Sequence, residues 1–277
     1  MSWRPTWWLS FLAKVWPITG LSAKAIQIPV IGKILAAMAV PLFSGRNFNV
    51  SYLPINRELK SPQNVYLPLQ VLEELIKRSA YRVTINRCHC RDSKGCKNYP
   101  IENSCLLMGQ GTMDLAPWIA QPLGVGEAIA HARHMVGLGL TPMIGRVLMD
   151  NLFYGIPNTG TLLTVCFCCH CCCTVMSSAQ YLPPKAKDSI VRLKGMTITV
   201  DEQICKDCRS RECLEGCIVK AFTFDKGKVF HDAQKCKGCG WCVSLCPQKA
   251  VQAEVADMNA AVEEVIGRIE SMINYSS

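Results

Sequence analysis

Regular spacing of apolar side chains near the N-terminus predicts an amphipathic helix. Pro5 suits the first helical position, where the missing N–H of proline costs nothing. Pro17 ends the apolar run, because proline breaks a helix interior. The positions that form the apolar face are Trp8, Phe11, Leu12, Val15 and Trp16.

A second apolar stretch, Ile34–Phe43, is ten residues long and carries no charge, and Pro41 interrupts it. At a rise of about 1.5 Å per residue, such a helix cannot cross a hydrocarbon core of about 30 Å. We therefore expect residues 1–50 to form an interfacial or partner-docking segment rather than a transmembrane helix.

The middle of the chain mixes two periodicities. Apolar residues recur at helical spacing within Val65–Ser79, and Gly126–Gly139 has the pattern of a helix that ends at glycine. The β-branched stretch Arg82–Ile85 and the run Thr161–Val165 predict strands. We expect helices and strands to be combined in this region.

Two further elements are predicted near the C-terminus. The segments Phe222–Phe224 and Lys228–Phe230 flank the turn residues Asp225–Gly227, which indicates a β-hairpin. Apolar residues at helical spacing within Asp257–Ile273 predict an amphipathic helix. We assign its apolar face to the core or to a subunit contact rather than to a cofactor site.

Charge changes the interpretation of the N-terminal segment. The chain of 277 residues has a net charge of +9, and its first 57 residues contain six basic side chains and no acidic one. Nucleic acid can bind a basic segment, but tryptophans interleaved with basic residues favour a membrane interface. Docking on a partner subunit and packing on the protein's own second domain remain alternatives. The candidate docking residues are Trp7, Trp8, Phe11, Leu12 and Trp16.

A signal peptide is a further alternative for this segment. Ala23–Ala25 imitates a cleavage site, but Lys14 and Pro17 interrupt the apolar region. We therefore expect this segment to be retained.

Eighteen cysteines occur in four clusters, with long cysteine-free stretches between them. This clustering favours metal ligation over a disulfide framework, and it suits a reducing, anaerobic cytoplasm. Zinc knuckles use paired cysteines, but they do not need a third and fourth cysteine within ten residues.

Eight of the cysteines form two runs near the C-terminus, each spaced to wrap an iron–sulfur cubane. One tight loop supplies three thiolates to a cubane, and the other run supplies the fourth. The first cluster would take Cys205, Cys208, Cys213 and Cys246. The second cluster would take Cys236, Cys239, Cys242 and Cys217.

These runs resemble the bacterial two-cluster ferredoxins over roughly residues 196–254. The second run, Cys236–Pro247, fits the family pattern throughout. The first run departs from it, with four residues before Cys213 and with Ile218 in place of proline. The resemblance implies a ferredoxin fold with two [4Fe-4S] clusters.

The other ten cysteines form two groups in the middle region, and their number indicates one or two additional iron–sulfur centres. An extended Val165–Cys173 would point Cys166, Cys168, His170 and Cys172 to one face. Cys169, Cys171 and Cys173 would then point to the other. Two cubanes, one larger cluster, or one cubane beside free thiols all fit this count. The ten are Cys88, Cys90, Cys96, Cys105, Cys166, Cys168, Cys169, Cys171, Cys172 and Cys173.

The middle region also resembles a group of anaerobe iron–sulfur proteins. These proteins carry Cys-x-Cys-Arg, here Cys88–Arg91, and a later helix with Glu-Ala near its start, here Glu127-Ala128. A Cys-x-Cys-Cys-x-Cys-Cys motif follows, here Cys166–Cys172, and then a two-cluster ferredoxin. The resemblance implies electron transfer and no specific substrate. We interpret His89 and His170 as neighbours that hydrogen-bond to cluster sulfur rather than as ligands.

We therefore predict an α+β protein with four parts: residues 1–50 for attachment, 51–190 as a Cys-rich domain, 191–254 as a ferredoxin domain and 255–277 as a C-terminal helix. The expected function is one-electron transfer between redox partner proteins in a multi-subunit oxidoreductase, in the cytoplasm or at an anionic membrane surface on its cytoplasmic face. We expect no nucleotide or nucleic acid as partner, since no GxGxxG or P-loop motif stands out. The alternatives are a reductase with an unusual middle cluster and a cluster-transfer scaffold.

Overall fold

The computed structural model describes residues 4–54, 59–60, 68–205 and 208–276. Its centre is an antiparallel six-stranded sheet with the order β1-β6-β7-β4-β3-β5. The predicted strand Arg82–Ile85 is confirmed, and the second predicted strand lies slightly further along the chain. The strands are β1 (Phe48–Tyr52), β3 (Arg82–Ile85), β4 (Leu106–Met108), β5 (Ala120–Pro122), β6 (Thr141–Val147) and β7 (Leu163–Cys168).

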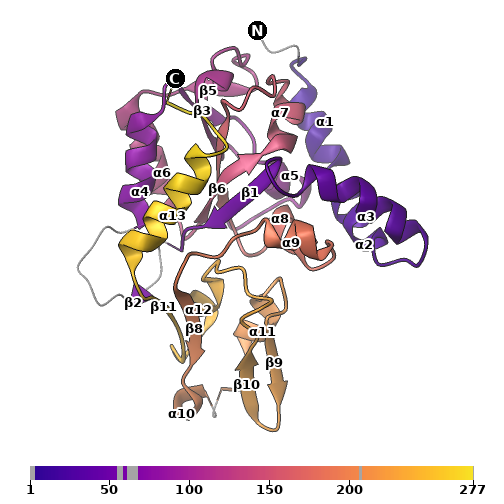
Figure 1. Ribbon diagram of the computed structural model, residues 1–277, viewed down its shortest axis with the longest axis vertical. Coiled ribbons are helices and arrows are strands. Elements are labelled where there is room, and N and C mark those ends of the chain that lie inside the picture. The colour runs from indigo at the N-terminus through magenta and orange to yellow at the C-terminus, as the bar shows by residue number, and fades with distance from the viewer. Residues whose placement is uncertain (1–3, 55–58, 61–67, 206–207, 277) are drawn as a thin grey trace.

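Helices cover both faces of this sheet (Figure 1). Successive side chains of β4 point to opposite faces of the sheet and so enter two separate parts of the core. Leu106 packs with α4, α6 and α13, whereas Leu107 packs with Leu9 of α1 and Tyr154 of α7. The short 3-10 helix η1 (Gln110–Thr112) follows β4. The helices are α1 (Trp8–Val15), α4 (Pro68–Arg78), α5 (His89–Ser93), α6 (Val125–Gly137), α7 (Leu148–Tyr154) and α13 (Met258–Glu270).

Two N-terminal helices, α2 and α3, extend away from the sheet (Figure 1). At the start of α3, a Cβ on Gly32 would lie 2.1 Å from the carbonyl oxygen of Ile26, so only glycine fits there. No helix among the described residues is long and apolar enough to span a membrane. The helices of this region are α2 (Pro17–Ala25), α3 (Ile31–Leu42), α8 (Thr174–Ala179) and α9 (Pro184–Asp188).

The predicted apolar face of the first helix was partly wrong. Leu9, Leu12 and Ala13 are the residues of α1 that the structure buries, whereas Phe11 is 42% exposed. The inward stripe is therefore rotated relative to the predicted one. The chain resumes a helix at Pro17 rather than stopping there, since proline is tolerated in a first turn.

The ferredoxin-like region forms a smaller layer below the sheet (Figure 1). Strands β8 and β11 pair antiparallel, and β2 pairs parallel with β11. The predicted hairpin is confirmed as β9 and β10. The elements are β2 (Leu59–Lys60), β8 (Met196–Val200), α10 (Glu202–Cys205), α11 (Glu212–Gly216), β9 (Phe222–Asp225), β10 (Lys228–His231), α12 (Trp241–Leu245) and β11 (Val251–Val255).

Several elements cross the predicted domain limits. Strand β1 spans the limit at residue 50, and β2 belongs to the sheet of the ferredoxin-like region. The predicted C-terminal helix is confirmed as α13, and it packs on the central sheet. Arg268 of α13 donates hydrogen bonds to Asn49 and to Ser51 Oγ, the latter at 2.6 Å.

Candidate functional site

The ten cysteines of the middle region separate into two groups of thiols. The larger group, which we call the six-thiol site, combines residues at the start of α5, the residue before β4, residues of β7 and the residue before α8. The Cys88 thiol lies within hydrogen-bonding reach of Cys90 and Cys105. The members of the six-thiol site are Cys88, Cys90, Cys105, Cys166, Cys168 and Cys173.

Strand pairing explains how distant cysteines meet at the six-thiol site. Leu106 of β4 pairs with Val165 of β7, so Cys105 and Cys166 are neighbours across the ladder. Their Sγ atoms lie 3.7 Å apart. The chain reverses after β7, and this brings Cys173 Sγ to 3.5 Å from Cys168 Sγ.

The smaller group, which we call the four-thiol site, consists of Cys96, Cys169, Cys171 and Cys172. All four Sγ atoms lie within 4.8 Å of one another. Cys96 follows α5, and the other three lie in the turn after β7. This grouping corrects the predicted alternation, because β7 ends at Cys168 and the chain then turns. Cys172 therefore joins Cys169 and Cys171, while Cys173 joins Cys168.

Arg91 places a buried cation between the two groups of thiols. Its side chain is 1% exposed, and Nη1 donates a hydrogen bond of 2.9 Å to the carbonyl oxygen of Phe167. Nε and Nη2 have no hydrogen-bond partner within the described residues. Unpaired guanidinium donors beside thiols fit an anionic thiolate-ligated cluster, which would accept these hydrogen bonds. The Cys-x-Cys-Arg motif contains this residue, but its sequence alone did not indicate a role.

His89 lies beside the six-thiol site in an aromatic environment. Its ring lies 5.1 Å from the ring of Trp16, and its Nε2 lies 3.3 Å from the hydroxyl of Tyr154. Burial lowers the pKa of His89 to about 4, so the ring is neutral at pH 7. His170, in the turn of the four-thiol site, has its ring 6.4 Å from Tyr99.

The ferredoxin-like region repeats one local structure twice. Asp201 and Asp232 each accept backbone hydrogen bonds from the two residues that begin the following turn. Cys205 N and Cys236 N donate to the carbonyl oxygens of the same aspartates. Each repeat thus begins its cysteine loop in the same way.

The thiols of these repeats come together in two sets of four, in the grouping that their spacing predicts. Burial, with the charges of Cys246, Cys205 and Cys208, raises the pKa of Cys213 to about 11. Burial, with Cys236 and Cys217, raises the pKa of Cys242 to about 12. Such thiols ionise at neutral pH only when a cation shares the site. Ligation of clusters by these thiols stays a prediction.

Backbone N–H groups point at sulfur in the second set. Gly238 N lies 3.4 Å from Cys236 Sγ, and Ala221 N lies 3.3 Å from Cys217 Sγ. Hydrogen bonds to ligand sulfur stabilise the thiolate and help to set cluster potentials. The donor set therefore fits a thiolate-bound iron–sulfur cluster.

Trp241 connects the ferredoxin-like region to the six-thiol site. It follows Cys239 and precedes Cys242, and its Nε1 donates a hydrogen bond of 3.0 Å to Thr141 Oγ1 of β6. Its ring centroid lies 6.0 Å from that of Tyr52, whose hydroxyl lies 3.4 Å from Cys173 Sγ. All three side chains are buried.

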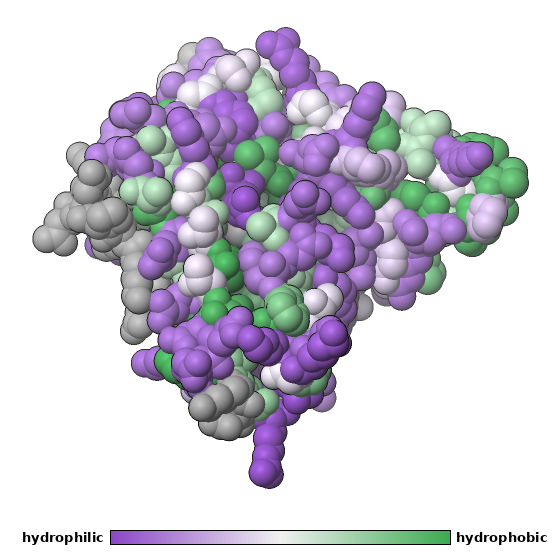
Figure 2. All heavy atoms as spheres, turned by 60° about the horizontal axis from the view of Figure 1, so that its bottom comes forward, coloured by the Kyte–Doolittle hydropathy of each residue, from purple (hydrophilic) through white to green (hydrophobic). Residues whose placement is uncertain are grey.

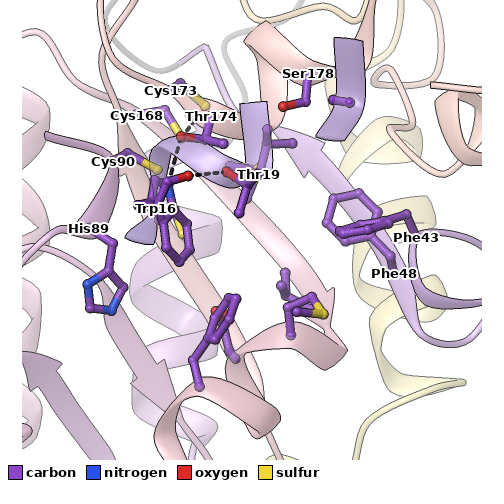
Figure 3. Close-up of a pocket in the computed structure, with 18 of the residues that line it drawn as sticks. Trp16, Thr19, Phe43, Phe48, His89, Cys90, Cys168, Cys173, Thr174 and Ser178 are labelled. Carbon is purple, nitrogen blue, oxygen red and sulfur yellow. Dashed lines mark hydrogen bonds between the residues drawn. The ribbon is translucent and has the colours of Figure 1, made fainter. Parts of the chain in front are cut away.

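An apolar cavity of about 390 Å³ lies between the six-thiol site and the N-terminal helices. Figure 3 shows Cys90, Cys168 and Cys173 gathered at one end of it, with Phe43 and Phe48 lying away from them. The apolar wall on the side of α2 and α3 includes Ala23, Ile26, Leu35, Met38 and Ala39.

The five candidate docking residues differ in their exposure and in their contacts within the protein. Trp7 and Phe11 are exposed, and their rings meet edge to face at 5.6 Å. Leu12 is buried in the protein itself. Trp8 Nε1 donates to the carbonyl oxygen of Phe153 at 2.6 Å, and Trp16 Nε1 donates to Thr174 Oγ1 at 2.9 Å. The polar ends of two of the five side chains are therefore engaged within the protein.

Comparisons with known proteins support iron–sulfur binding by the ferredoxin-like region. Residues 229–252, which include Cys236, Cys239, Cys242 and Cys246, match the family of 4Fe-4S binding domains. The chain is 32% identical over 92 residues to the formate dehydrogenase iron–sulfur subunit of Wolinella succinogenes, covering 31% of this chain and 46% of that protein. It is 30% identical over 95 residues to the electron transport protein HydN of Escherichia coli, covering 32% of this chain and 54% of that protein.

The chain thus spans about half the length of these two relatives. No solved structure matches the chain. The chain is also 33% identical over 60 residues to an uncharacterized ferredoxin of Methanocaldococcus jannaschii, covering 21% of this chain and 97% of that protein. With nearly a whole ferredoxin contained in it at this identity, the chain belongs to the ferredoxin family of iron–sulfur proteins.

Proposed function

We propose that this protein carries single electrons between its ferredoxin-like region and the six-thiol site, as a subunit of a larger oxidoreductase. The observation that carries this proposal is the buried contact of Trp241 with Tyr52, whose hydroxyl lies 3.4 Å from Cys173 Sγ. Bound iron–sulfur clusters supply reversible one-electron oxidation and reduction. The protein supplies the thiolates, excludes water and sets the local charge around them.

The proposed assignment of ligands follows from the grouping of the thiols. One cubane takes Cys205, Cys208, Cys213 and Cys246, and the other takes Cys236, Cys239, Cys242 and Cys217. The buried guanidinium of Arg91 offsets negative charge at the six-thiol site. We further propose that residues 51–190, apart from β2, form the Cys-x-Cys-Arg domain of anaerobe iron–sulfur proteins, fused to the ferredoxin domain 191–254.

Anaerobic purification with iron and sulfide analysis and an EPR-monitored redox titration tests this function. We expect two cubane signals together with at least one separate one-electron signal from the middle region. About eight irons and only two signals would contradict a redox role for the six-thiol site. The matched variant Cys242→Ser should remove a cubane signal and leave the middle-region signal in place.

The N-terminal helices are proposed to attach the protein to an anionic membrane surface at the cytoplasmic face. The apolar residues that face solvent in α2, α3 and the connection between them form a patch, visible at the right of Figure 2. Basic side chains accompany this patch, and no acidic residue occurs in residues 1–57. The exposed apolar residues are Ile18, Leu21, Ile28, Val30, Ile31, Ile34, Met38 and Leu42.

The apolar cavity favours a second candidate function, reduction of a small molecule at the six-thiol site. Cys90, Cys168 and Cys173 share its wall with apolar side chains of α2 and α3, so an apolar compound could reach them. An EPR signal of the middle region that shifts on adding an uncharged apolar quinone would favour this reductase over a simple carrier. A middle-region EPR signal that does not change at a saturating quinone concentration would count against the reductase function.

A further inference from the structure

The geometry points to a mononuclear zinc site at the four-thiol site, distinct from the iron–sulfur clusters. We propose that Cys96, Cys169, Cys171 and Cys172 bind one Zn²⁺ in tetrahedral coordination. This site would be structural, and its existence does not depend on the electron-transfer function proposed above.

The spacing of the sulfur atoms carries the proposal. Four thiolates bound at about 2.3 Å to one tetrahedral zinc stand about 3.8 Å apart. The Sγ–Sγ distances in the structure are 3.9 Å for Cys96–Cys171 and 3.5 Å for Cys172–Cys171. All four Sγ atoms lie within 4.8 Å of one another. A single ion can therefore contact every member of the group.

The ferredoxin-like region provides an internal comparison. A cubane binds its four thiolates through four different irons, so these thiolates stand further apart than those on one ion. Among the described residues, the four-thiol site is the one group of three or more metal-binding side chains whose ligand atoms all lie within 4.8 Å of one another. The Sγ atoms of the two sets of ferredoxin cysteines are spaced more widely, although both sets lie in the described part of the chain. The same protein thus has two kinds of thiol spacing.

The surroundings of the four-thiol site also suit a structural zinc ion. The backbone N–H groups of Asn98 and Tyr99 lie close to the Cys96 sulfur. Four cysteine ligands leave no open coordination position, as in structural rather than catalytic zinc sites. Cys96, Cys171 and Cys172 lie outside the lining of the apolar cavity.

A zinc ion here would join two segments that build the six-thiol site. Cys96 follows Cys88 and Cys90 by a few residues, and the turn of Cys169–Cys172 lies between Cys168 and Cys173. Crosslinking these segments would fix the spacing of the six thiols while taking no part in redox chemistry, because Zn²⁺ has no accessible redox change.

Metal analysis of the whole chain, expressed with both iron and zinc and purified anaerobically, tests the proposal. We expect about one zinc per chain, absent from Cys171→Ser, with the iron of the ferredoxin cubanes unchanged in that variant. The matched variant Cys242→Ser should lose cubane iron and keep its zinc. Zinc-free wild-type protein, or a Cys171→Ser variant that loses about four irons, would overturn the proposal in favour of a cubane.

X-ray absorption at the zinc edge of the wild-type protein keeps the test independent of how the variants fold. Four sulfur neighbours at about 2.3 Å are expected. Oxygen or nitrogen neighbours, which indicate zinc bound elsewhere, would overturn the assignment, and so would iron in place of zinc with the spectrum of a single iron bound by four thiolates.

Discussion

Trp241 of the ferredoxin-like region packs against Tyr52 of the central sheet, with ring centroids 6.0 Å apart at an interplanar angle of 67°. Trp241 belongs to α12 and Tyr52 belongs to β1, and these two elements lie far apart in the sequence. Each adjoins a different group of thiols, since Trp241 precedes Cys242 and the hydroxyl of Tyr52 lies 3.4 Å from Cys173 Sγ. This contact joins the ferredoxin-like region to the six-thiol site.

The first prediction concerns how the ferredoxin-like region is held on the sheet. Trp241→Phe should lower the free energy of unfolding by about 1 to 3 kcal/mol, because the indole hydrogen bond to Thr141 is lost and a small cavity opens. Trp118→Phe is the matched control, since Trp118 is exposed and donates only to the carbonyl oxygen of Arg4. Anaerobic denaturation of both variants checks this, and equal losses would show that the buried hydrogen bond is unimportant.

The second prediction concerns the charge of Arg91. Its buried guanidinium would stabilise the reduced, more negative state of a cluster bound at the six-thiol site. Arg91→Gln should therefore lower the reduction potential of the middle region, by roughly 60 mV or more, which is at least a tenfold change for one electron. Redox titration of Arg133→Gln, which removes an exposed guanidinium paired with Glu73, should leave that potential unchanged. Equal potentials in wild type and Arg91→Gln would refute the charge argument.

The third prediction concerns Asp150, which is buried and accepts a hydrogen bond of 2.7 Å from Thr164. Burial raises the pKa of this carboxyl from 3.8 to about 6, against the opposing effects of Thr164 and Arg146. The folded state binds the proton more tightly than the unfolded state does. The stabilisation that comes from protonating Asp150 in the folded state is therefore complete below pH 4 and is lost as the pH rises through 6.

Asp150→Asn should consequently be more stable than the wild type at pH 8, by up to about 3 kcal/mol. At pH 4 the two proteins should be nearly equal, because the carboxyl is then protonated. Anaerobic melting at both pH values checks the difference between the variants. A stability difference that does not change with pH would mean that Asp150 does not titrate in this range.

The fourth prediction concerns membrane attachment through α3. Ile31 and Ile34 are 56% and 60% exposed, and neither lines the apolar cavity. The double variant Ile31→Glu, Ile34→Glu should lose binding to anionic phosphatidylserine vesicles, because the charges oppose both burial and surface attraction. Leu138→Glu serves as the control, since Leu138 caps the C-terminal end of α6 and is exposed there, away from α3. Wild-type protein that fails to sediment with these vesicles would favour a partner subunit instead.

Local elements were predictable because they depend on neighbours in the sequence. The β-branched stretch Arg82–Ile85 and the hairpin around Gly227 form strands as predicted. The two sets of ferredoxin thiols also follow from their spacing, since one loop must supply three of four ligands.

The grouping of the middle cysteines was not predictable in the same way. It depends on where β7 ends, and the assumption of an extended chain beyond Cys168 placed Cys172 and Cys173 in the wrong groups. The contacts of Arg91 with Phe167 and of Trp241 with Tyr52 join residues far apart in the sequence. No local sequence pattern encodes these contacts, because they form only through the tertiary packing of the chain.

Rapid-freeze EPR of electron movement within the chain tests the central claim most directly. A pulse of low-potential reductant should first reduce the ferredoxin cubanes, and the signal of the six-thiol site should then grow as theirs decays. With Trp241→Leu and Tyr52→Leu combined, iron content should be retained and this transfer should be slower. Transfer at the wild-type rate in that double variant, or no transfer in the wild type, would contradict the account.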